Sequence, residues 1–236
     1  NGFFDGSGDG HTVTAGLELK NSARNGFHFS FKPAVSFIQK SDAYGNTSAT
    51  TVKSDTLNSS YSSKFNNSRS IGTSGQLNLG ITGLGGKDGR SLSLYTYYDY
   101  SGGNGKSGEN TSTMTGDSLS ALSLLYDKKS SNLRVYTSLS YSEPFGDKWT
   151  MAIGASSNYY SSISEKIATD GFDGLYNDYY TSITDNRNLN LSGNVGMQYR
   201  AKGHIVYLSL RANAVETVNY LKNLGTETTA GKDEWH

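Results

Sequence analysis

Residues 147–160, DKWTMAIGASSNYY, decide the fold that this sequence predicts. Trp149, Met151, Ile153 and Tyr159 lie on one alternating track, and the positions between them hold Thr, Ala, Gly, Ser and Asn. Alternation with a period of two is typical of a β-strand that has one apolar and one polar face. The stretch therefore predicts a strand whose two faces meet different surroundings.

The same alternation recurs along the whole chain, and no helical period competes with it. We therefore expect an all-β protein with about eight strands. The apolar track of these strands, which we interpret below as lipid-facing, carries Val13, Leu17, Leu19, Phe29, Phe31, Leu77, Leu79, Leu92, Leu94, Val135, Leu139, Met151, Ile153, Leu189, Leu191, Val195, Val206, Leu208 and Leu210.

The composition excludes several classes of function. The 236 residues suit one domain, and the 34% that are hydrophobic include 17 tyrosines, so the chain is polar but patterned. The 21 basic and 21 acidic residues cancel, so the charge indicates no nucleic-acid partner. The absence of cysteine excludes disulfides, thiolate zinc sites and cysteine catalysis, and the four histidines lack metal-ligand spacing. We expect neither a metal nor another cofactor.

Short and long connections alternate between the expected strands. The short ones are rich in turn residues: KNSARNG at 20–26, GLGGKDGR at 83–90, EPFGDK at 143–148 and RAKGH at 200–204. The long ones, rich in Ser, Thr, Asn, Asp and Gly, cover residues 41–68, 102–130, 161–186 and 214–236. This order predicts an antiparallel up-and-down meander. Pro33 lacks an amide hydrogen, so we expect a bulge or a strand end there.

The two faces of the expected strands differ more than those of an ordinary soluble sheet. The apolar track carries no charged residue, whereas the other track is small and polar, with isolated charges at Glu18, Lys32, Arg134 and Arg211. The span from Trp149 to Tyr159 projects to about 23 Å on a strand tilted by about 45°. Outer-membrane barrels have an apolar band about 25 Å tall between two aromatic girdles.

These patterns predict a transmembrane β-barrel in the bacterial outer membrane. The apolar face would contact the lipid bilayer, and the polar face would line a water-filled lumen. The short connections are then periplasmic turns, one of them made by Glu143, Pro144, Phe145 and Gly146, and the long ones are extracellular loops. The expected aromatic girdles contain Trp149, Tyr159, Tyr98, Tyr100, Tyr141 and Tyr199.

The stretch YSEPFGDKW, residues 141–149, resembles a turn of the Bacteroidetes outer-membrane β-barrel family, whose members are similar to the barrels of TonB-dependent receptors. The turn GKDGRSLSL at 86–94 is also similar to turns of this family. The resemblance implies an outer-membrane transporter for nutrient uptake, with an N-terminal plug domain and TonB as partners in a full receptor. The family pattern is matched by Tyr141, Glu143, Pro144, Phe145, Gly146, Lys148 and Trp149.

The chain also departs from that family. It shows no plug and no TonB-contacting segment, it is too short for the roughly 22 strands of such receptors, and it ends in GKDEWH instead of an amphipathic strand. Two kinds of barrel fit: a segment of a larger receptor-like barrel, or a small closed barrel of about eight strands with a structural or adhesive role. A soluble glycan-binding β-sandwich is the third alternative, because half-buried sheets alternate as well.

The sequence predicts no catalytic or metal site. His28 and Ser30 share a strand face, but no acid or oxyanion donor converges on them, so we expect no enzyme. Asp5 and Asp9 lack the other ligand positions of a calcium loop, and a solvated loop is the better interpretation. GLGGKDGR lacks the order of a phosphate-binding loop. The Tyr-rich residues 158–180 fit a girdle better than a glycan-stacking surface.

Overall fold

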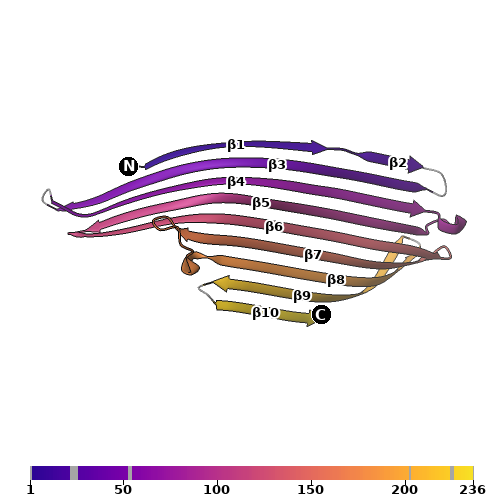
Figure 1. The fold of residues 1–236 in the computed structure, drawn as a ribbon. Coiled ribbons are helices and arrows are strands. Elements are labelled where there is room, and N and C mark those ends of the chain that lie inside the picture. The colour runs from indigo at the N-terminus through magenta and orange to yellow at the C-terminus, as the bar shows by residue number, and fades with distance from the viewer. Residues whose placement is uncertain (1, 22–25, 53–54, 202, 224–225, 236) are drawn as a thin grey trace.

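The computed structural model describes the backbone of residues 2–21, 26–52, 55–201, 203–223 and 226–235. These residues form ten β-strands and two short 3-10 helices (Figure 1). The elements are β1 (Gly2–Thr14), β2 (Leu17–Asn21), β3 (Phe27–Val52), β4 (Asp55–Thr82), η1 (Leu84–Gly86), β5 (Ser91–Thr115), β6 (Ser118–Phe145), β7 (Trp149–Asp170), η2 (Asp178–Tyr180), β8 (Ser182–Ala201), β9 (His204–Asn223) and β10 (Thr226–Trp235).

All ten strands belong to one antiparallel sheet. Consecutive strands pair from β3 through to β10, and β1 and β2 both pair with β3 (Figure 1). The predicted all-β, antiparallel up-and-down arrangement is therefore confirmed. β1 and β2 form one edge and β10 forms the other, and within the described residues no pairing joins the two edges.

The sheet is thus open, which corrects the expectation of a small closed barrel of eight strands. A two-layered sandwich is not formed either, because a sandwich packs two sheets face to face and the described strands make a single layer. Neither of the described helices is long and apolar enough to cross a membrane. One curved layer therefore supplies both of the surfaces considered below.

Most of the residues predicted as long loops are strand, so that prediction is wrong for 41–68, 102–130, 161–186 and 214–236. β3 and β4 run through residues 41–52 and 55–68, and β5 and β6 through 102–115 and 118–130. β7 and β8 cover 161–170 and 182–186, and β9 and β10 cover 214–223 and 226–235. These segments are rich in Ser, Thr and Asn, which is a composition typical of loops. They still form long hairpins, because backbone hydrogen bonds between strands need no apolar side chain.

The register places the predicted apolar track on one face of the sheet, called the apolar face here. Directly paired residues of neighbouring strands share a face, and one row across the sheet runs through Leu19, Phe29, Leu79, Leu94 and Leu139. All residues predicted to face lipid and all six predicted girdle residues lie on this face. The opposite, polar face carries Glu18, Lys32, Arg134 and Arg211.

Pro33 lies inside β3 without a bulge, and it interrupts the neighbouring strand instead. It pairs with Gly75 of β4 on one side, and on the other side its carbonyl accepts a hydrogen bond of 3.0 Å from the amide of Ala15. Because the N–H and C=O of one residue point to the same neighbour in an antiparallel ladder, the missing donor faces the edge. The edge splits there into β1 and β2, so the predicted strand end exists, but one strand away.

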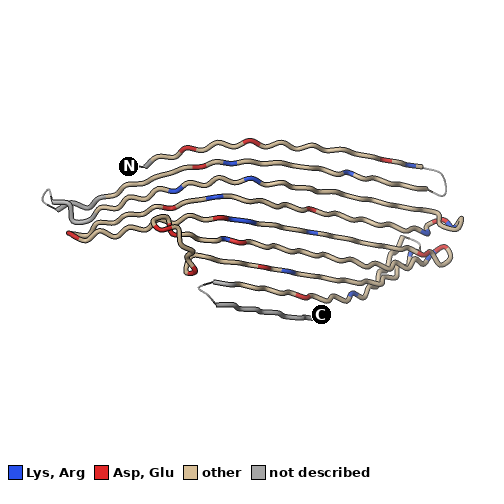
Figure 2. The backbone as a smooth tube through the Cα atoms, in the orientation of Figure 1, with Lys and Arg blue, Asp and Glu red and all other residues tan. Residues whose placement is uncertain are grey.

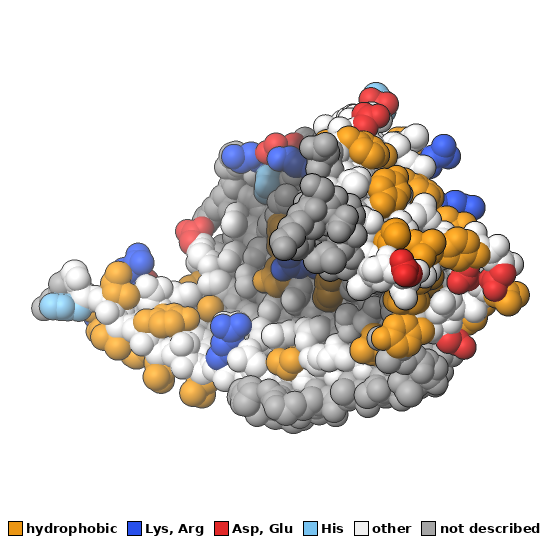
Figure 3. Space-filling model, turned by 90° about the vertical axis from the view of Figure 1, so that its left-hand side faces the viewer, with side chains coloured by type: hydrophobic (Ala, Val, Ile, Leu, Met, Phe, Trp, Pro, Cys, Tyr) orange, Lys and Arg blue, Asp and Glu red, His pale blue; other side chains and the backbone are white. Residues whose placement is uncertain are grey.

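The sheet has almost no core of its own. Among the described residues, only Leu124 and Ala168 are buried hydrophobics, whereas Leu208 and Leu210 are 68% and 75% exposed. The accessible surface is 15701 Å², and a compact monomer of 25.5 kDa would have about 10,400 Å². Figure 3 shows hydrophobic side chains along the outer side of the curved wall. Soluble monomers rarely expose an apolar surface of this size, so another phase or partner must cover it.

Candidate functional site

An uncharged band crosses the apolar face over seven strands, and we call it the apolar band. On each strand it covers about 9–11 residues, which is the number that a tilted strand needs to cross the hydrocarbon of a bilayer. No Asp, Glu, Lys or Arg lies on this face within the band, and Figure 2 shows most charges near the short turns and in the long-hairpin half of the sheet. The segments are Phe27–Phe37, Ile71–Ile81, Leu92–Tyr100, Leu133–Tyr141, Trp149–Tyr159, Leu189–Tyr199 and Val206–Ala214.

Aromatic residues lie at both ends of the apolar band. At the end near the short turns, Trp149 of β7 pairs directly with Tyr199 of β8, and their ring centroids are 4.6 Å apart. At the other end, Tyr98 of β5 and Tyr159 of β7 both pair with Val135 of β6, which places them in one transverse row. The predicted girdle residues thus occupy the two borders of the band, where amphipathic aromatic rings are favoured at a membrane–water interface.

The polar face lies on the inner side of the bend. Ser30, Ser107, Leu124 and Ala168 are all buried, and the register puts all four on this face. Within the height of the apolar band this face is lined mainly by small polar residues, which form cross-strand hydrogen bonds such as that of 2.7 Å between the hydroxyls of Ser93 and Ser140. Its composition suits contact with water better than contact with hydrocarbon.

The residues predicted as polar lumen charges share this face but do not form one cluster. Glu18 contacts His28 at 3.4 Å in an exposed pair near the short-turn end. Arg134 lies opposite Asp99 on the neighbouring strand. Arg211 donates a hydrogen bond of 3.1 Å to Asn213 on its own strand. The structure therefore brings no two of Glu18, Lys32, Arg134 and Arg211 together.

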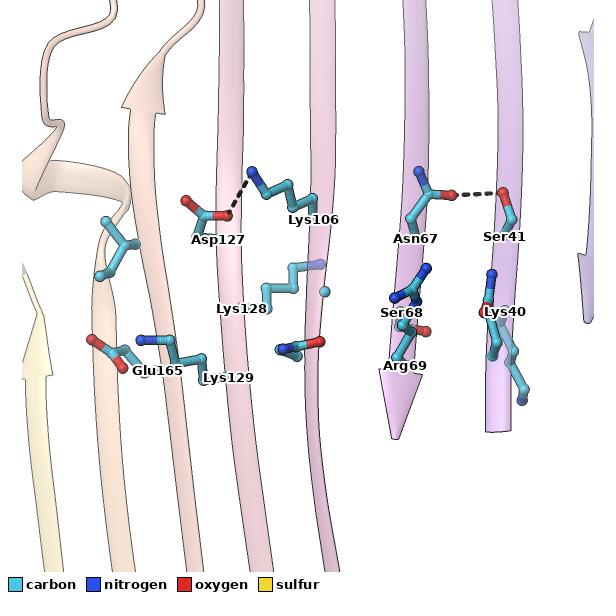
Figure 4. Close-up of a pocket in the computed structure, with 14 residues that line it drawn as sticks. Lys40, Ser41, Asn67, Ser68, Arg69, Lys106, Asp127, Lys128, Lys129 and Glu165 are labelled. Carbon is cyan, nitrogen blue, oxygen red and sulfur yellow. Dashed lines mark hydrogen bonds and ion pairs between the residues drawn. The ribbon is translucent and has the colours of Figure 1, made fainter. Parts of the chain in front are cut away.

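A charged groove of about 830 Å³ lies just beyond the apolar band, lined mostly from the apolar face (Figure 4). A row across four strands sets Arg69, Asn104, Lys129 and Glu165 side by side. The next row contains an exposed ion pair between Lys106 Nζ and Asp127 Oδ1 at 3.8 Å (Figure 4). Sequence reasoning missed this groove because its residues lie in segments predicted as loops.

Glu143 is the centre of a polar cluster that joins two of the short turns. Its carboxylate accepts hydrogen bonds from Lys87 Nζ at 2.6 Å and from Arg90 Nε and Nη2 at 2.7 and 2.9 Å, and Tyr141 Oη donates a further one. Glu143 is 8% exposed. The sequence predicts a turn at Glu143, but this residue lies near the end of β6. Of the four predicted turn residues, only Gly146 lies between strands, and its φ is 65°.

These contacts favour the charged form of the carboxyl. The hydrogen bonds from Arg90, Lys87 and Tyr141 hold the pKa of Glu143 far below its usual range, although partial burial acts in the opposite direction. The hydrogen bond with Glu143 also raises the pKa of Arg90. The cluster therefore fixes the turn between β4 and β5 to the turn between β6 and β7, two connections that are not adjacent in the chain.

We expect Glu143→Gln to reduce the loss of stability in acid. Because the native contacts lower its pKa, Glu143 contributes stability that is complete above the unfolded value of about 4.3 and is lost as the pH falls toward the lower native value. Urea unfolding in detergent should show a stability difference between the two proteins that is largest near pH 7 and shrinks below about pH 4. Asp147→Asn removes a carboxylate from the same turn without removing these contacts, and serves as the control. A difference that stays constant with pH would contradict this role.

The segment 171–181 connects β7 to β8 and is anchored to both β6 and β7. The amide of Gly171 donates to the carbonyl of Ser123 at 2.8 Å, and the amide of Ala168 donates to Thr181 Oγ1 at 3.0 Å. Tyr179, 65% exposed, packs against Tyr180 in a T-shaped, edge-to-face contact with ring centroids 4.8 Å apart. The tyrosines of the Tyr-rich stretch therefore divide between β7 and this segment, and only Tyr159 borders the apolar band.

The described residues hold no group of three His, Cys, Asp or Glu side chains that could bind a metal ion. Asp5 and Asp9 lie in β1 and not in a solvated loop, which corrects that interpretation. His28 and Ser30 share the polar face, and the acid near His28 is Glu18. Comparison with protein-family models and with curated proteins gives no match for this chain.

Proposed function

We propose that this chain forms part of the wall of an outer-membrane β-barrel, in which the apolar face contacts lipid and the polar face contacts water in a lumen. The observation that carries the proposal is the apolar band: an uncharged belt, bordered by aromatic rings, whose length on each strand matches a bilayer. Lipid would cover the exposed leucines and phenylalanines that the single-layered sheet leaves without a protein partner.

A wall of this kind needs further strands at both of its edges. Within hydrocarbon, an unpaired backbone N–H or C=O costs several kcal/mol, so membrane sheets close into barrels. Within the apolar band the edges are β1 and β2 on one side and β9 on the other, because β10 pairs only with residues 214–223 of β9, and both edges are unpaired within the described residues. The proposal therefore places additional strands beside both edges, and the closed barrel is wider than the ten strands present here.

A wide barrel suits the role of a transporter. Barrels of about eight strands fill their interior with side chains, whereas larger ones enclose a channel or a plugged lumen, and the polar face here carries mostly small side chains. The long hairpins, such as residues 101–132, extend beyond the band by on the order of 35 Å and would form the extracellular rim. Together with the resemblance of residues 141–149, this supports a receptor-like transporter for a nutrient ligand, which would work with a plug domain and TonB.

The test is what each face contacts when the full-length protein is reconstituted in a bilayer. Probes on the apolar band should contact lipid, and probes on the polar face at the same height should contact water. Water at both faces, or exclusion of both lipid and water from the apolar band, would contradict the proposal.

A further inference from the structure

Two lysines lie directly opposite each other on the polar face, in the long-hairpin half of the sheet beyond the apolar band. Lys128 of β6 pairs directly with Lys166 of β7, and neither forms an ion pair within the part of the chain that the structure describes. Like charges directly opposite each other on a sheet are destabilising. Partial burial lowers the pKa of Lys128, and the charge of Lys166 lowers it further. The ligand-free protein therefore carries an unfavourable contact at this position.

The surroundings hold the two ammonium groups in place without neutralising them. Nζ of Lys166 lies 4.4 Å from the ring centroid of Tyr126, and Nζ of Lys128 lies 6.0 Å from it, which are cation–π distances. Glu109, the acid on the adjacent strand, is already bound to Lys64 at 2.6 Å. Four other charges of this face lie nearest along the strands or across them. Asp42 and Lys40 on β3 are three strands from Lys128, a backbone separation of about 14 Å. Asp170 is four residues from Lys166 along β7, and Arg134 is six residues from Lys128 along β6.

Hydroxyl, amide and charged groups line the two grooves beside the lysine pair. Asn66, Lys128 and Lys166 line both a groove of about 520 Å³ and one of about 470 Å³. The charged residues Asp42, Lys64 and Glu109 also line the first groove, and Arg69, Lys129 and Glu165 also line the second. Ser107, directly opposite Tyr126, lines the first groove, is 7% exposed, and has a buried hydroxyl without a hydrogen-bond partner. A buried polar group of this kind calls for a partner that is missing from the chain itself. Movement of the flexible lysine side chains would give a ligand access to it.

We propose that Lys128 and Lys166, with Asn66 and Ser107, bind an oxyanion group of a water-soluble ligand: a carboxylate, sulfate or phosphate. An anion between the two ammonium groups converts their repulsion into two charge-assisted hydrogen bonds. The amide of Asn66 and the hydroxyl of Ser107 can donate further hydrogen bonds to its oxygens. The inference rests on the proposed function in one respect, namely that the polar face opens to water. It then names an anionic class for the transported nutrient.

The test is calorimetric titration of the full-length protein at low ionic strength with citrate, inorganic phosphate and, as a neutral control, glucose. We expect citrate or phosphate to bind and glucose not to bind at about 10 mM. Lys128→Gln combined with Lys166→Gln should weaken anion binding at least about tenfold, because two charged hydrogen bonds are lost. Each single variant should also raise the melting temperature of the ligand-free protein, because it removes the like-charge contact.

Lys106→Gln is the matched control, because Lys106 lies on the opposite face, where it pairs with Asp127, and lines neither of the two grooves. It should keep anion affinity within about threefold, since it removes the same charge without a hydrogen bond to the ligand. Equal losses in Lys106→Gln and in the double variant, or equal binding of glucose, would overturn the site. If the two faces show the expected lipid and water contacts but neither anion binds, the site fails and the proposed barrel wall stands.

Discussion

Leu139→Arg is expected to destabilise the folded protein in a bilayer by about 2–3 kcal/mol, because an arginine on the lipid face of a barrel costs about 2–4 kcal/mol at the midplane and less toward the interfaces. Leu139 lies on the apolar face of β6, inside the band that runs from Leu133 to Tyr141, and it is 44% exposed in the isolated sheet. Reversible unfolding from lipid vesicles in urea measures the loss. A smaller yield of the folded, heat-modifiable form on a gel would show it qualitatively.

Ser138→Arg is the matched control for this experiment. Ser138 precedes Leu139 but lies on the polar face, opposite Tyr95 and Ser156. There the new guanidinium can reach water, as Arg134 does on the same strand, and surface substitutions of this kind change stability by no more than about 0.5 kcal/mol. Equal losses at positions 138 and 139 would contradict the assignment of the two faces.

Thr137→Pro is expected to cost several kcal/mol, on the order of 3 or more, because it leaves a backbone acceptor unpaired inside hydrocarbon. Thr137 lies in the middle of the band on β6, with Thr96 of β5 on one side and Ser157 of β7 on the other. A proline there has no edge toward which its missing N–H can point. The measurement is again unfolding from vesicles, compared with Thr137→Val, which keeps the amide and removes only the hydroxyl.

The native Pro33 provides the second comparison. Its missing donor faces the edge, where β1 and β2 are already interrupted. Pro33→Ala should therefore change stability by less than about 1 kcal/mol in either direction. A loss at Thr137→Pro no larger than that of Thr137→Val would show that β6 is not paired on both sides within the membrane.

The alternation of side chains was sufficient to predict the apolar face. Leu94 and Leu139 were assigned to one track from spacing alone, and the register pairs them directly. This succeeds because a strand with unlike surroundings on its two faces must alternate, and a shift of one residue would exchange the faces. The strand Trp149–Asp170 begins where DKWTMAIGASSNYY predicts it.

The long hairpin ends could not be predicted from the same signal. Beyond Tyr100 both faces of β5 carry mostly small polar residues, and beyond Leu133 the apolar residues of β6, such as Leu124 and Leu125, fall on both faces. The sequence therefore stops alternating although the backbone ladder continues. The charged groove and the lysine pair lie in these segments and were missed with them. The sequence contains no direct indication of the groove or of the lysine pair. Lys128 and Lys166, for example, are 38 residues apart, and only the register of β6 and β7 brings them together.

The turn cluster was predicted in part. The sequence EPFGDK places Glu143 in a turn because it is rich in turn residues, whereas its partners Lys87 and Arg90 are predicted only as part of another turn. Their contact depends on the order of β4 to β7 in the sheet, which places the two turns side by side. Sequence spacing alone carries no information about which turns are neighbours.

The central claim is that the apolar face contacts lipid and the polar face contacts water. The chain contains no cysteine, so Leu139→Cys and Ser138→Cys each give one site for a nitroxide label. Collision with oxygen, which concentrates in hydrocarbon, and with a water-soluble nickel complex should be measured for both labels in the protein reconstituted in a bilayer. We predict high oxygen and low nickel accessibility at position 139, and the reverse at position 138. High nickel accessibility at 139, or protection of that label from both reagents, would contradict the account.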